Sequence, residues 1–291
     1  MSESGEADLP SWIERVKSDP VAYLERQVVE VILTAIAQEP NLREKIILKG
    51  GTLMGVVHKS PRQTGDLDFT TILSARQDKI HEFIRDSLNR QFHSAANRLG
   101  NPDLLVRIQS LQLKPRKDSF ARKDFPALIL KISYARRGSP EQRLHETGQG
   151  IKVIEVDISF NEPIGKTIPI RLGDDHTHIL AYSLIDLLAE KYRAYLQQEV
   201  RKRNRRQDIF DIHHLLCMYD LTEQQKSALL ETLKQKCQAR GIHPKQTSLE
   251  DPGLIERARS EWHTQKLEVM DLPDFEVCFR TANTLYKNLP W

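Results

Sequence analysis

The sequence has few cysteines, no long hydrophobic run and little net charge, and each absence excludes a class of protein. Its three cysteines, Cys217, Cys237 and Cys278, are odd in number and form no Cys-x-x-Cys pair. We therefore expect free thiols rather than a disulfide framework or a zinc site. No apolar stretch approaches the roughly 20 residues that cross a bilayer, so no membrane span is predicted.

The N-terminal segment, MSESGEADLPSW, is polar and acidic and lacks the basic and apolar regions of a signal peptide. We therefore expect a cytoplasmic protein. With 291 residues, of which 39% are hydrophobic, the chain can bury a sizeable core. This length is typical of one or two domains.

The most informative stretch lies between residues 46 and 71. A short apolar run leads into Gly50 and Gly51, and the residues from Thr52 to His58 look like the first turns of a helix. Glycine lets the backbone come close to a ligand, and the free amides of a helix N-terminus favour an anion such as phosphate. This pattern predicts a phosphate-binding turn, although a plain glycine turn is the simpler interpretation of Gly-Gly alone.

Two acidic residues follow this turn in a segment that alternates polar and apolar side chains. Asp66 and Asp68 are two residues apart, so on a strand they point to the same face. Two like charges side by side repel, and Mg²⁺, which prefers carboxylate oxygens and substrate phosphates, relieves that repulsion. With Arg62 and Thr64 just ahead, the acids predict a metal site rather than a merely solvated strand end.

A third carboxylate stands in the clearest strand of the sequence, at 152–160. Its apolar residues face one side, while Glu155 and Asp157 face the other. A charged residue in the middle of such a strand needs a partner. Asp157 either joins the metal site or, with Glu155, lines a solvated face of the sheet.

The order of the predicted elements indicates two halves. Helices are expected at 12–38 and 75–99, and strands at 104–113, 127–134, 152–160 and 167–172, with an exposed basic loop at 114–124. Beyond residue 175 helical patterns take over, at 179–200, 207–219, 222–240 and 274–289. We therefore predict an α/β (α+β) fold, with a mixed-sheet domain at 1–175 and a helical domain at 176–291.

The net charge of +3 and the isoelectric point of about 8.6 are only mildly basic. The basic residues nevertheless gather in three clusters, at 114–123, 136–143 and 201–206. Such clusters are most often solvated faces. Beside a candidate phosphate and metal site, they favour a nucleic-acid substrate.

Taken together, these motifs resemble the DNA polymerase beta-like nucleotidyltransferases, and most closely the AbiEii/AbiGii (MenT-like) toxin family. The residues that match the family pattern are Gly50, Gly51, Thr52, Arg62, Thr64, Asp66, Asp68 and Phe69. Asp157 matches the third carboxylate that these enzymes bring from a neighbouring strand. Glu155 lies on the same face but does not match the motif, so we leave it out of the site.

The resemblance continues into the helical half. Lys191 is placed to neutralise nucleotide phosphate, for which a point charge is sufficient. The segment 203–211 is similar to the family's Arg, then Lys/Arg-Asp-x-x-Asp pattern, and its Asp208 and Asp211 share one helical face. Asp208 would orient Lys191 or the nucleotide. Gln207 departs from the family pattern, which usually has a basic residue there, and Lys191 alone would fit a surface lysine equally well.

The resemblance implies a polymerase beta-like catalytic domain at 1–175 and a helical domain that completes the nucleotide site. Asp66, Asp68 and Asp157 would hold Mg²⁺, and Gly50, Gly51, Thr52, Arg62, Thr64 and Lys191 would bind the nucleoside triphosphate donor. Lys191 and Asp208 would join the three acids in catalysis. The implied biology is that of a toxin in a toxin–antitoxin or abortive-infection system. It would modify tRNA, at its acceptor end, or another RNA, and it would have a cognate antitoxin.

Three other functions fit parts of the sequence. A nucleotidyl- or phosphotransferase that acts on a protein such as the antitoxin would use the same residues. A transferase of cationic small molecules such as aminoglycosides would favour an acidic cleft, which the basic clusters argue against. A non-catalytic nucleotide- or RNA-binding regulator would not need all three carboxylates.

Overall fold

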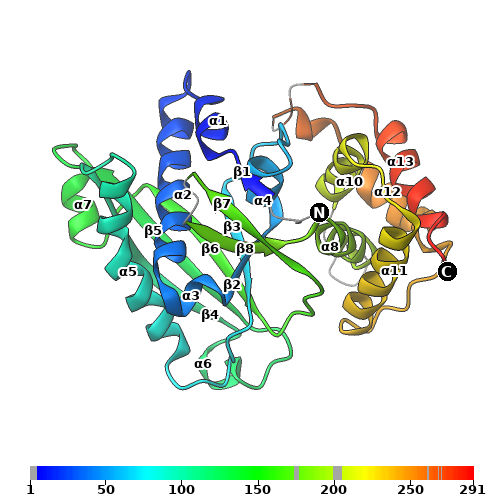
Figure 1. Cartoon of the computed structure of the whole chain (residues 1–291), viewed down its shortest axis with the longest axis horizontal. Coiled ribbons are helices and arrows are strands. Elements are labelled where there is room, and N and C mark those ends of the chain that lie inside the picture. The colour runs from blue at the N-terminus through cyan, green and yellow to red at the C-terminus, as the bar shows by residue number, and fades with distance from the viewer. Residues whose placement is uncertain (1–4, 174–176, 199–204, 261, 268, 270) are drawn as a thin grey trace. The chain divides into compact units, whose positions relative to one another are not determined.

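The computed structural model describes residues 5–173, 177–198, 205–260, 262–267, 269 and 271–291 (Figure 1). The chain divides into two compact units, which are discontinuous in sequence. The first comprises Met1–Lys59, Thr64–Glu162 and Ile168–Ala181; the second comprises Ser60–Gln63, Pro163–Thr167 and Tyr182–Trp291. The predicted class, a mixed sheet flanked by helices with a helical C-terminal part, is confirmed.

The strands of the described residues form one eight-stranded sheet in the order β1-β7-β8-β2-β3-β6-β5-β4. Their bounds are β1 Gly5–Ala7, β2 Ile46–Lys49, β3 Asp66–Thr71, β4 Leu104–Lys114, β5 Ala127–Arg136, β6 Val153–Phe160, β7 Thr167–Leu172 and β8 His178–Tyr182. Strand β3 pairs antiparallel with β2 and parallel with β6, while β5 is antiparallel to both β6 and β4. The sheet is therefore mixed, and β3 lies at its centre.

The helices of the first unit are α1 Leu9–Glu14, α2 Pro20–Gln38, α3 Pro40–Arg43, α4 Gly50–Val56, α5 Ile80–Arg98, α6 Lys117–Phe120 and α7 Gln142–Glu146. Helices α2 and α5 cover one face of this sheet (Figure 1). Helix α7 lies on the opposite face, where His145 contacts Ser133 of β5 and Arg107 of β4 donates to the Glu146 carbonyl. Helix α2 begins cleanly because Asp19 caps it by accepting from the amides of Val21 and Ala22, and Pro20 fills its first turn. Its apolar stripe, including Val28, Ile32 and Ile36, is buried in the core.

The second unit is helical. Its elements are α8 Leu184–Leu196, α10 Arg206–Met218, α11 Glu223–Gln238, α12 Pro252–Arg259 and α13 Phe275–Lys287, with short 3₁₀ turns at Ser248–Glu250 and Trp262–Leu267. Helix α8 packs against α10 and α11, and α10 packs against α13. The Tyr192 hydroxyl, fully buried on α8, donates to the Ala282 carbonyl at 2.8 Å. The polar residues that α8 and α10 carry inward therefore lie in a packed environment.

The start of the helical half differs from the prediction. Residues 179–182, expected on a helix, belong to β8, which pairs parallel with β2 so that Leu180 is opposite Ile47. A short apolar run fits a buried strand as well as a helix, and here pairing to the sheet decides. The helix begins only at Leu184, where the Ser183 side chain caps it, and the predicted end at Val200 lies outside the described residues.

The basic segment at 114–124, predicted as an exposed loop, contains the short helix α6. Phe120 at its end is buried and packs edge-on against Phe160 with ring centroids 5.4 Å apart. Arg116, Arg122 and Lys123 are exposed as expected. An aromatic anchor inside the segment accounts for its local order, and charge counting alone did not reveal it.

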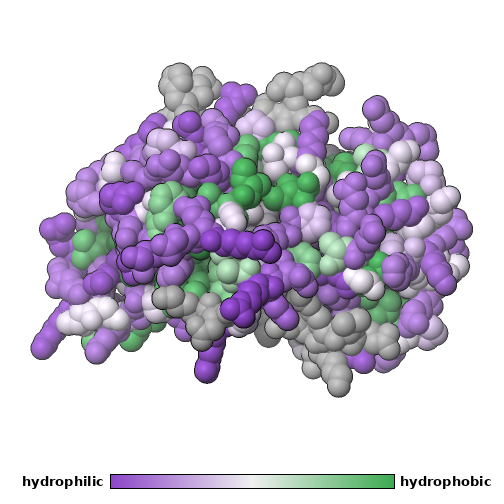
Figure 2. Space-filling model, turned by 90° about the horizontal axis from the view of Figure 1, so that it is seen from below, coloured by the Kyte–Doolittle hydropathy of each residue, from purple (hydrophilic) through white to green (hydrophobic). Residues whose placement is uncertain are grey.

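All three cysteines are free thiols, as predicted; Cys237 and Cys278 are buried and Cys217 is exposed. Every helix in the described part of the chain is too short or too polar to span a bilayer. The face drawn in Figure 2 is mainly hydrophilic, with hydrophobic residues in limited patches. Arg201, Lys202 and Arg203 of the third basic cluster lie outside the described residues.

Candidate functional site

The three predicted metal-binding carboxylates lie on two neighbouring parallel strands. Asp68 on β3 is the register partner of Asp157 on β6, and Asp66 is the partner of Glu155. Because register partners share a face of the sheet, all four carboxylates project from the same side. Asp66 is exposed, while Asp68 and Asp157 are half-buried. The predicted alternation of β3 is confirmed by its buried Leu67 and Phe69.

The glycine turn lies directly beside these acids. Gly50 has a φ of +70°, and a Cβ atom placed on it would be only 2.2 Å from Oδ2 of Asp68. A side chain at this position would be strained and would collide with the carboxylate. The structure therefore explains why glycine begins α4: the Asp68 carboxylate occupies the space above its backbone.

Lys49 completes a row of charges across three strands. It is the register partner of Asp68 on β2, and it is buried. Its ammonium forms an ion pair with Glu162 and donates to Ser159 Oγ at 3.3 Å, while Ser159 donates to Asp157 Oδ1 at 3.4 Å. Lys49 is therefore linked to Asp157 through one hydroxyl.

Electrostatics mark these acids as unusual. Partial burial, followed by the neighbouring Glu155 charge, raises the pKa of Asp66. Burial also raises the pKa of Asp157, and the nearby Lys49 cation opposes that effect without cancelling it. In both cases the protein disfavours the charged form that it places in a row of carboxylates. A bound cation would remove this disadvantage.

Whether the site fits a divalent metal depends on its donors and on their convergence. The donors are oxygens of carboxylates on adjacent strands, the type of ligand that Mg²⁺ prefers. Among the described residues, however, no three His, Cys, Asp or Glu side chains already converge on one point. The donor chemistry and strand positions fit Mg²⁺, and binding requires the carboxylates of Asp66, Asp68 and Asp157 to rotate toward a common centre.

The two threonines of the motif differ in their environments. Thr52 is buried in α4, and its hydroxyl donates to the Asp66 carbonyl at 3.2 Å. It thus ties the glycine turn to the start of β3. Thr64 is half-buried two residues before β3. Their predicted contact with the nucleotide stays a prediction.

The second unit contains its own cluster of motif residues, centred on Asp211. Lys191 on α8 is buried, and its ammonium is 2.5 Å from Asp211 Oδ2. Arg62 reaches the same carboxylate with both Nε, at 3.2 Å, and Nη2, at 3.1 Å. Asp211 is fully buried; burial alone would raise its pKa, but the Lys191 and Arg62 cations outweigh that effect and lower it.

Asp208, the predicted partner of Lys191, lies farther away. Its Oδ1 is 3.7 Å from the Lys191 ammonium, and its Oδ2 is buried and accepts no hydrogen bond from the described residues. Burial raises the pKa of Asp208, although the Lys191 and Arg205 cations act against it. Lys191 is therefore oriented mainly by Asp211. Asp208 Oδ2 is within 3.9 Å of the Arg205 guanidinium but has no hydrogen-bond donor among the described residues, so it can accept from a ligand.

The predicted residues thus divide between the units. Gly50, Gly51, Thr52, Thr64 and the three metal-binding candidates belong to the first, and Arg62, Lys191 and Asp208 belong to the second. Sequence reasoning missed Lys49 and Asp211 as members of these clusters. Asp211 could have been found from the sequence because it lies three residues after Asp208 on the same helix. The only sequence feature that pointed to Lys49 was its position just before the glycine turn.

Comparison with known proteins identifies the family. The family model for nucleotidyl transferase AbiEii toxins of type IV toxin–antitoxin systems matches residues 31–281. The chain belongs to the AbiEii family. It is accordingly a nucleotidyltransferase toxin of a type IV toxin–antitoxin system, and the family predicted from the motifs is confirmed. No curated protein gives a significant sequence match.

Two solved structures are similar to this chain. JHP933 from Helicobacter pylori is 15% identical over 91% of this chain and 90% of its own, with a TM-score of 0.51. MenT4, a nucleotidyltransferase toxin from Mycobacterium tuberculosis, is 13% identical over 96% of this chain and 99% of its own, with a TM-score of 0.46. At 15% identity, the likeness to JHP933 concerns the fold.

Proposed function

We propose that this AbiEii protein is a Mg²⁺-dependent nucleotidyltransferase that moves a nucleotide from a nucleoside triphosphate to RNA, with the 3′ end of tRNA as the acceptor. The observation that carries the proposal is the direct register of Asp68 with Asp157, beside Asp66 and the glycine turn at Gly50. Neighbouring carboxylates repel one another and do not stabilise the fold by themselves. They are suited to bind cations that in turn bind the phosphates of a substrate.

Asp66, Asp68 and Asp157 would hold the metal. When bound, Mg²⁺ supplies charge stabilisation for the attacking and leaving oxygens of the phosphoryl transfer. The raised pKa of Asp66 and Asp157 supports this role, because a cation favours their ionised forms. Asp157 would also accept the proton of the attacking hydroxyl. That oxygen then bonds to the α-phosphorus as the bond to pyrophosphate breaks.

Lys191 and Arg62 would neutralise the triphosphate. An ammonium has three donors, and Asp211 uses one of those on Lys191, so others are available to an anion. Asp211 keeps both cations in fixed positions, which lowers the cost of ordering them when a nucleotide binds. The unsatisfied oxygen of Asp208 supports its direct contact with a hydroxyl or a water of the bound nucleotide.

An RNA acceptor is supported by charge at the surface of the first unit. Arg116, Arg122 and Lys123 are exposed near the end of β4. Cations of this kind attract a phosphate backbone without selecting a base sequence. Modification of the tRNA end would block translation, which accords with a toxin, and the cognate antitoxin would relieve that block.

The decisive experiment incubates the protein with Mg²⁺, each labelled nucleoside triphosphate in turn, and total tRNA. Asp66→Ala should abolish transfer. Asp78→Ala, which removes an exposed acid beyond the far end of β3, should leave it unchanged. Asp66→Ala should no longer inhibit growth, and Asp78→Ala should inhibit growth as the wild type does.

The distribution of the label tests the proposal. Label on tRNA from the wild type but not from Asp66→Ala would support it and would also identify the nucleotide. Label on a protein instead of RNA would replace the RNA acceptor with a protein such as the antitoxin. Full toxicity of Asp66→Ala would overturn the catalytic role of the acidic row.

A further inference from the structure

The strands next to the carboxylates of Asp66, Asp68 and Asp157 carry further polar side chains on the same face of the sheet. Asp66 is in register with Glu155 on β6, Glu155 with Lys131 on β5, and Lys131 with Ser110 on β4. Register partners on adjacent strands have side chains on the same face. Lys131 and Ser110 therefore lie on the carboxylate face, and both are exposed.

A parallel set lies two residues farther along each strand. Asp68 is followed across the sheet by Asp157, Ile129 and Gln112, and Lys114 lies two residues beyond Gln112 on β4. Gln112 and Lys114 are exposed. The Lys114 cation is near enough to act on Asp157, whose pKa it helps to lower against the larger effect of burial. This face of β4 and β5, defined by Ser110, Gln112, Lys114 and Lys131, is called the β4–β5 face below.

Within the described ranges, the ammonium groups of Lys131 and Lys114, the two lysines of the β4–β5 face, form no ion pair or hydrogen bond. Lys114 attracts the Asp157 carboxylate only through a longer-range charge interaction. Adjacent strands are about 4.8 Å apart, so Lys131 is rooted about 5 Å from Glu155 and about 10 Å from Asp66. These two lysines thus lie beside the row of carboxylates formed by Asp66, Asp68 and Asp157.

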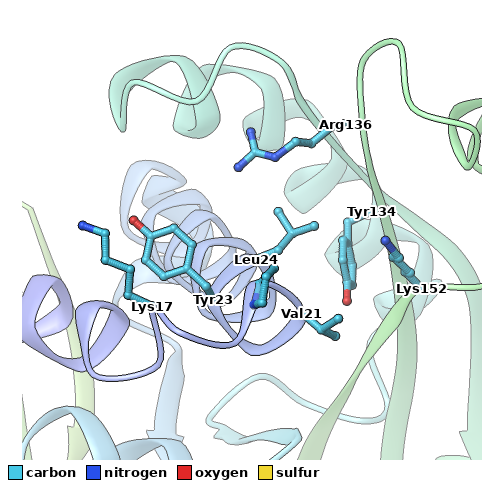
Figure 3. Close-up of a pocket in the computed structure, with 8 residues that line it drawn as sticks. Lys17, Val21, Tyr23, Leu24, Tyr134, Arg136 and Lys152 are labelled. Carbon is cyan, nitrogen blue, oxygen red and sulfur yellow. The ribbon is translucent and has the colours of Figure 1, made fainter.

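A lysine on the opposite face provides the contrast. Lys152, just before β6, lines a cavity of about 430 Å³ together with Tyr134 and Leu24 (Figure 3). Its ammonium is paired with Glu141 at 2.8 Å, and Arg136 in the same cavity is paired with Asp103 at 2.7 Å. The cations that line this cavity are therefore paired with acids.

We propose that the β4–β5 face binds the RNA strand that carries the reacting end, with Lys131 and Lys114 on its phosphates and Ser110 and Gln112 on its sugars or bases. This inference rests on the proposed function and adds the path of the substrate. Free cations beside a metal site match a polyanion that must bring one terminal hydroxyl to the carboxylates.

The chemistry of the face favours RNA over a protein partner. Protein interfaces have an apolar centre. The large hydrophobic side chains exposed in the described residues are Val21, Ile72, Leu144, Ile151, Met218 and Val277, and none of them lies on β4 or β5. Leu144 and Ile151 belong to the α7 segment, which packs at the far end of this face against Ser133 and Arg107, beyond Lys131. A polar surface with exposed lysines outside any ion pair in the described residues binds a sugar-phosphate backbone without such a centre.

The test measures binding of a fluorescent RNA stem-loop with a short unpaired 3′ tail, by anisotropy over a range of salt concentrations. The double variant Lys131→Gln/Lys114→Gln should bind more weakly and show a shallower log–log salt slope, by about 0.7 for each lost contact to single-stranded RNA. The control, Lys152→Gln, should bind as the wild type does. Affinity for nucleoside triphosphate, measured at saturating Mg²⁺, should be the same in all three proteins.

The outcomes separate this inference from the proposed function. If the wild type labels RNA but the double variant keeps its RNA affinity and salt slope, the β4–β5 face is not the path, and the proposed function stands. If the double variant loses nucleotide affinity as well, its lysines act on the donor and the inference is wrong. If the wild type labels only protein, the proposed function and the inference both fail.

Discussion

The two charged clusters of this AbiEii protein are built on opposite principles. In the first unit, Asp66, Asp68 and Asp157 stand side by side, partly exposed, and the protein raises the pKa of two of them. In the second unit, Asp211 is fully buried, paired with Lys191 and Arg62, and has a lowered pKa. The first cluster has one buried cation, Lys49, which is already paired with Glu162, whereas the second has two cations for one carboxylate.

This difference separates binding from positioning. A row of like charges is costly to hold together unless a ligand brings the opposite charge, so it marks a place where something binds. A buried carboxylate that satisfies two cations stabilises their geometry in the absence of any ligand. Changes in the first cluster should therefore affect ligand binding more than folding, and a change at Asp211 should affect folding first.

The largest effect on stability is expected from Asp211→Ala. This change leaves Lys191 and Arg62 buried without their carboxylate, which costs about 3–5 kcal/mol of unfolding free energy. Urea unfolding followed by circular dichroism measures it. Asp208→Asn serves as the comparison, because burial already disfavours the charge of Asp208 and its loss should cost much less. Equal losses in the two variants would contradict the central role of Asp211.

A smaller loss is expected from Gly50→Ala, at about 1–3 kcal/mol for a non-glycine residue in left-handed backbone. The new Cβ would also displace the Asp68 carboxylate, so Mg²⁺ affinity should fall together with stability. Gly65→Ala is the matched control, since its new Cβ would have no atom within 4 Å and the φ of Gly65 is not positive. Unchanged Mg²⁺ binding in Gly50→Ala would show that Asp68 does not hold the metal.

Much of the fold was predictable because its signals are local. The apolar stripe of α2, the Asp19 cap and the alternation of β3 each follow from neighbouring residues. The strand β8 was not predictable in this way, because its apolar run acquires its conformation only by pairing with β2. Phe120 illustrates the same limit, since one aromatic side chain orders a segment that its charges would leave exposed.

The candidate site shows the same division. The spacing of Asp66 and Asp68 predicted their common face, but only strand register places Asp157 opposite Asp68. Register depends on pairing between residues far apart in sequence, which periodicity does not encode. In the same way, helical spacing put Asp208 and Asp211 on one face, and only packing of α8 against α10 selects Asp211 as the partner of Lys191.

The smallest effect concerns the acidic row itself and has an unusual sign. Because the folded-state pKa of Asp66 is raised above 3.8, its negative charge destabilises the folded state at neutral pH. Asp66→Asn should therefore unfold at a slightly higher urea concentration than the wild type at pH 7 without Mg²⁺. Well below pH 3.8 the carboxyl is protonated in both folded and unfolded chains, and the difference should vanish.

Mg²⁺ should reverse this order. A ligand that binds only the folded state adds stability that grows with its concentration relative to Kd, by about 2.7 kcal/mol at 100 times Kd. The wild type should gain from Mg²⁺ at pH 7, and Asp66→Asn should gain little. Asp78→Asn, with an exposed acid outside the row, should follow the wild type at every pH and Mg²⁺ concentration. If Mg²⁺ stabilised Asp66→Asn as much as the wild type, the metal would bind elsewhere. The row of Asp66, Asp68 and Asp157 would then not be the ligand-binding cluster that its contrast with the buried Asp211 cluster indicates.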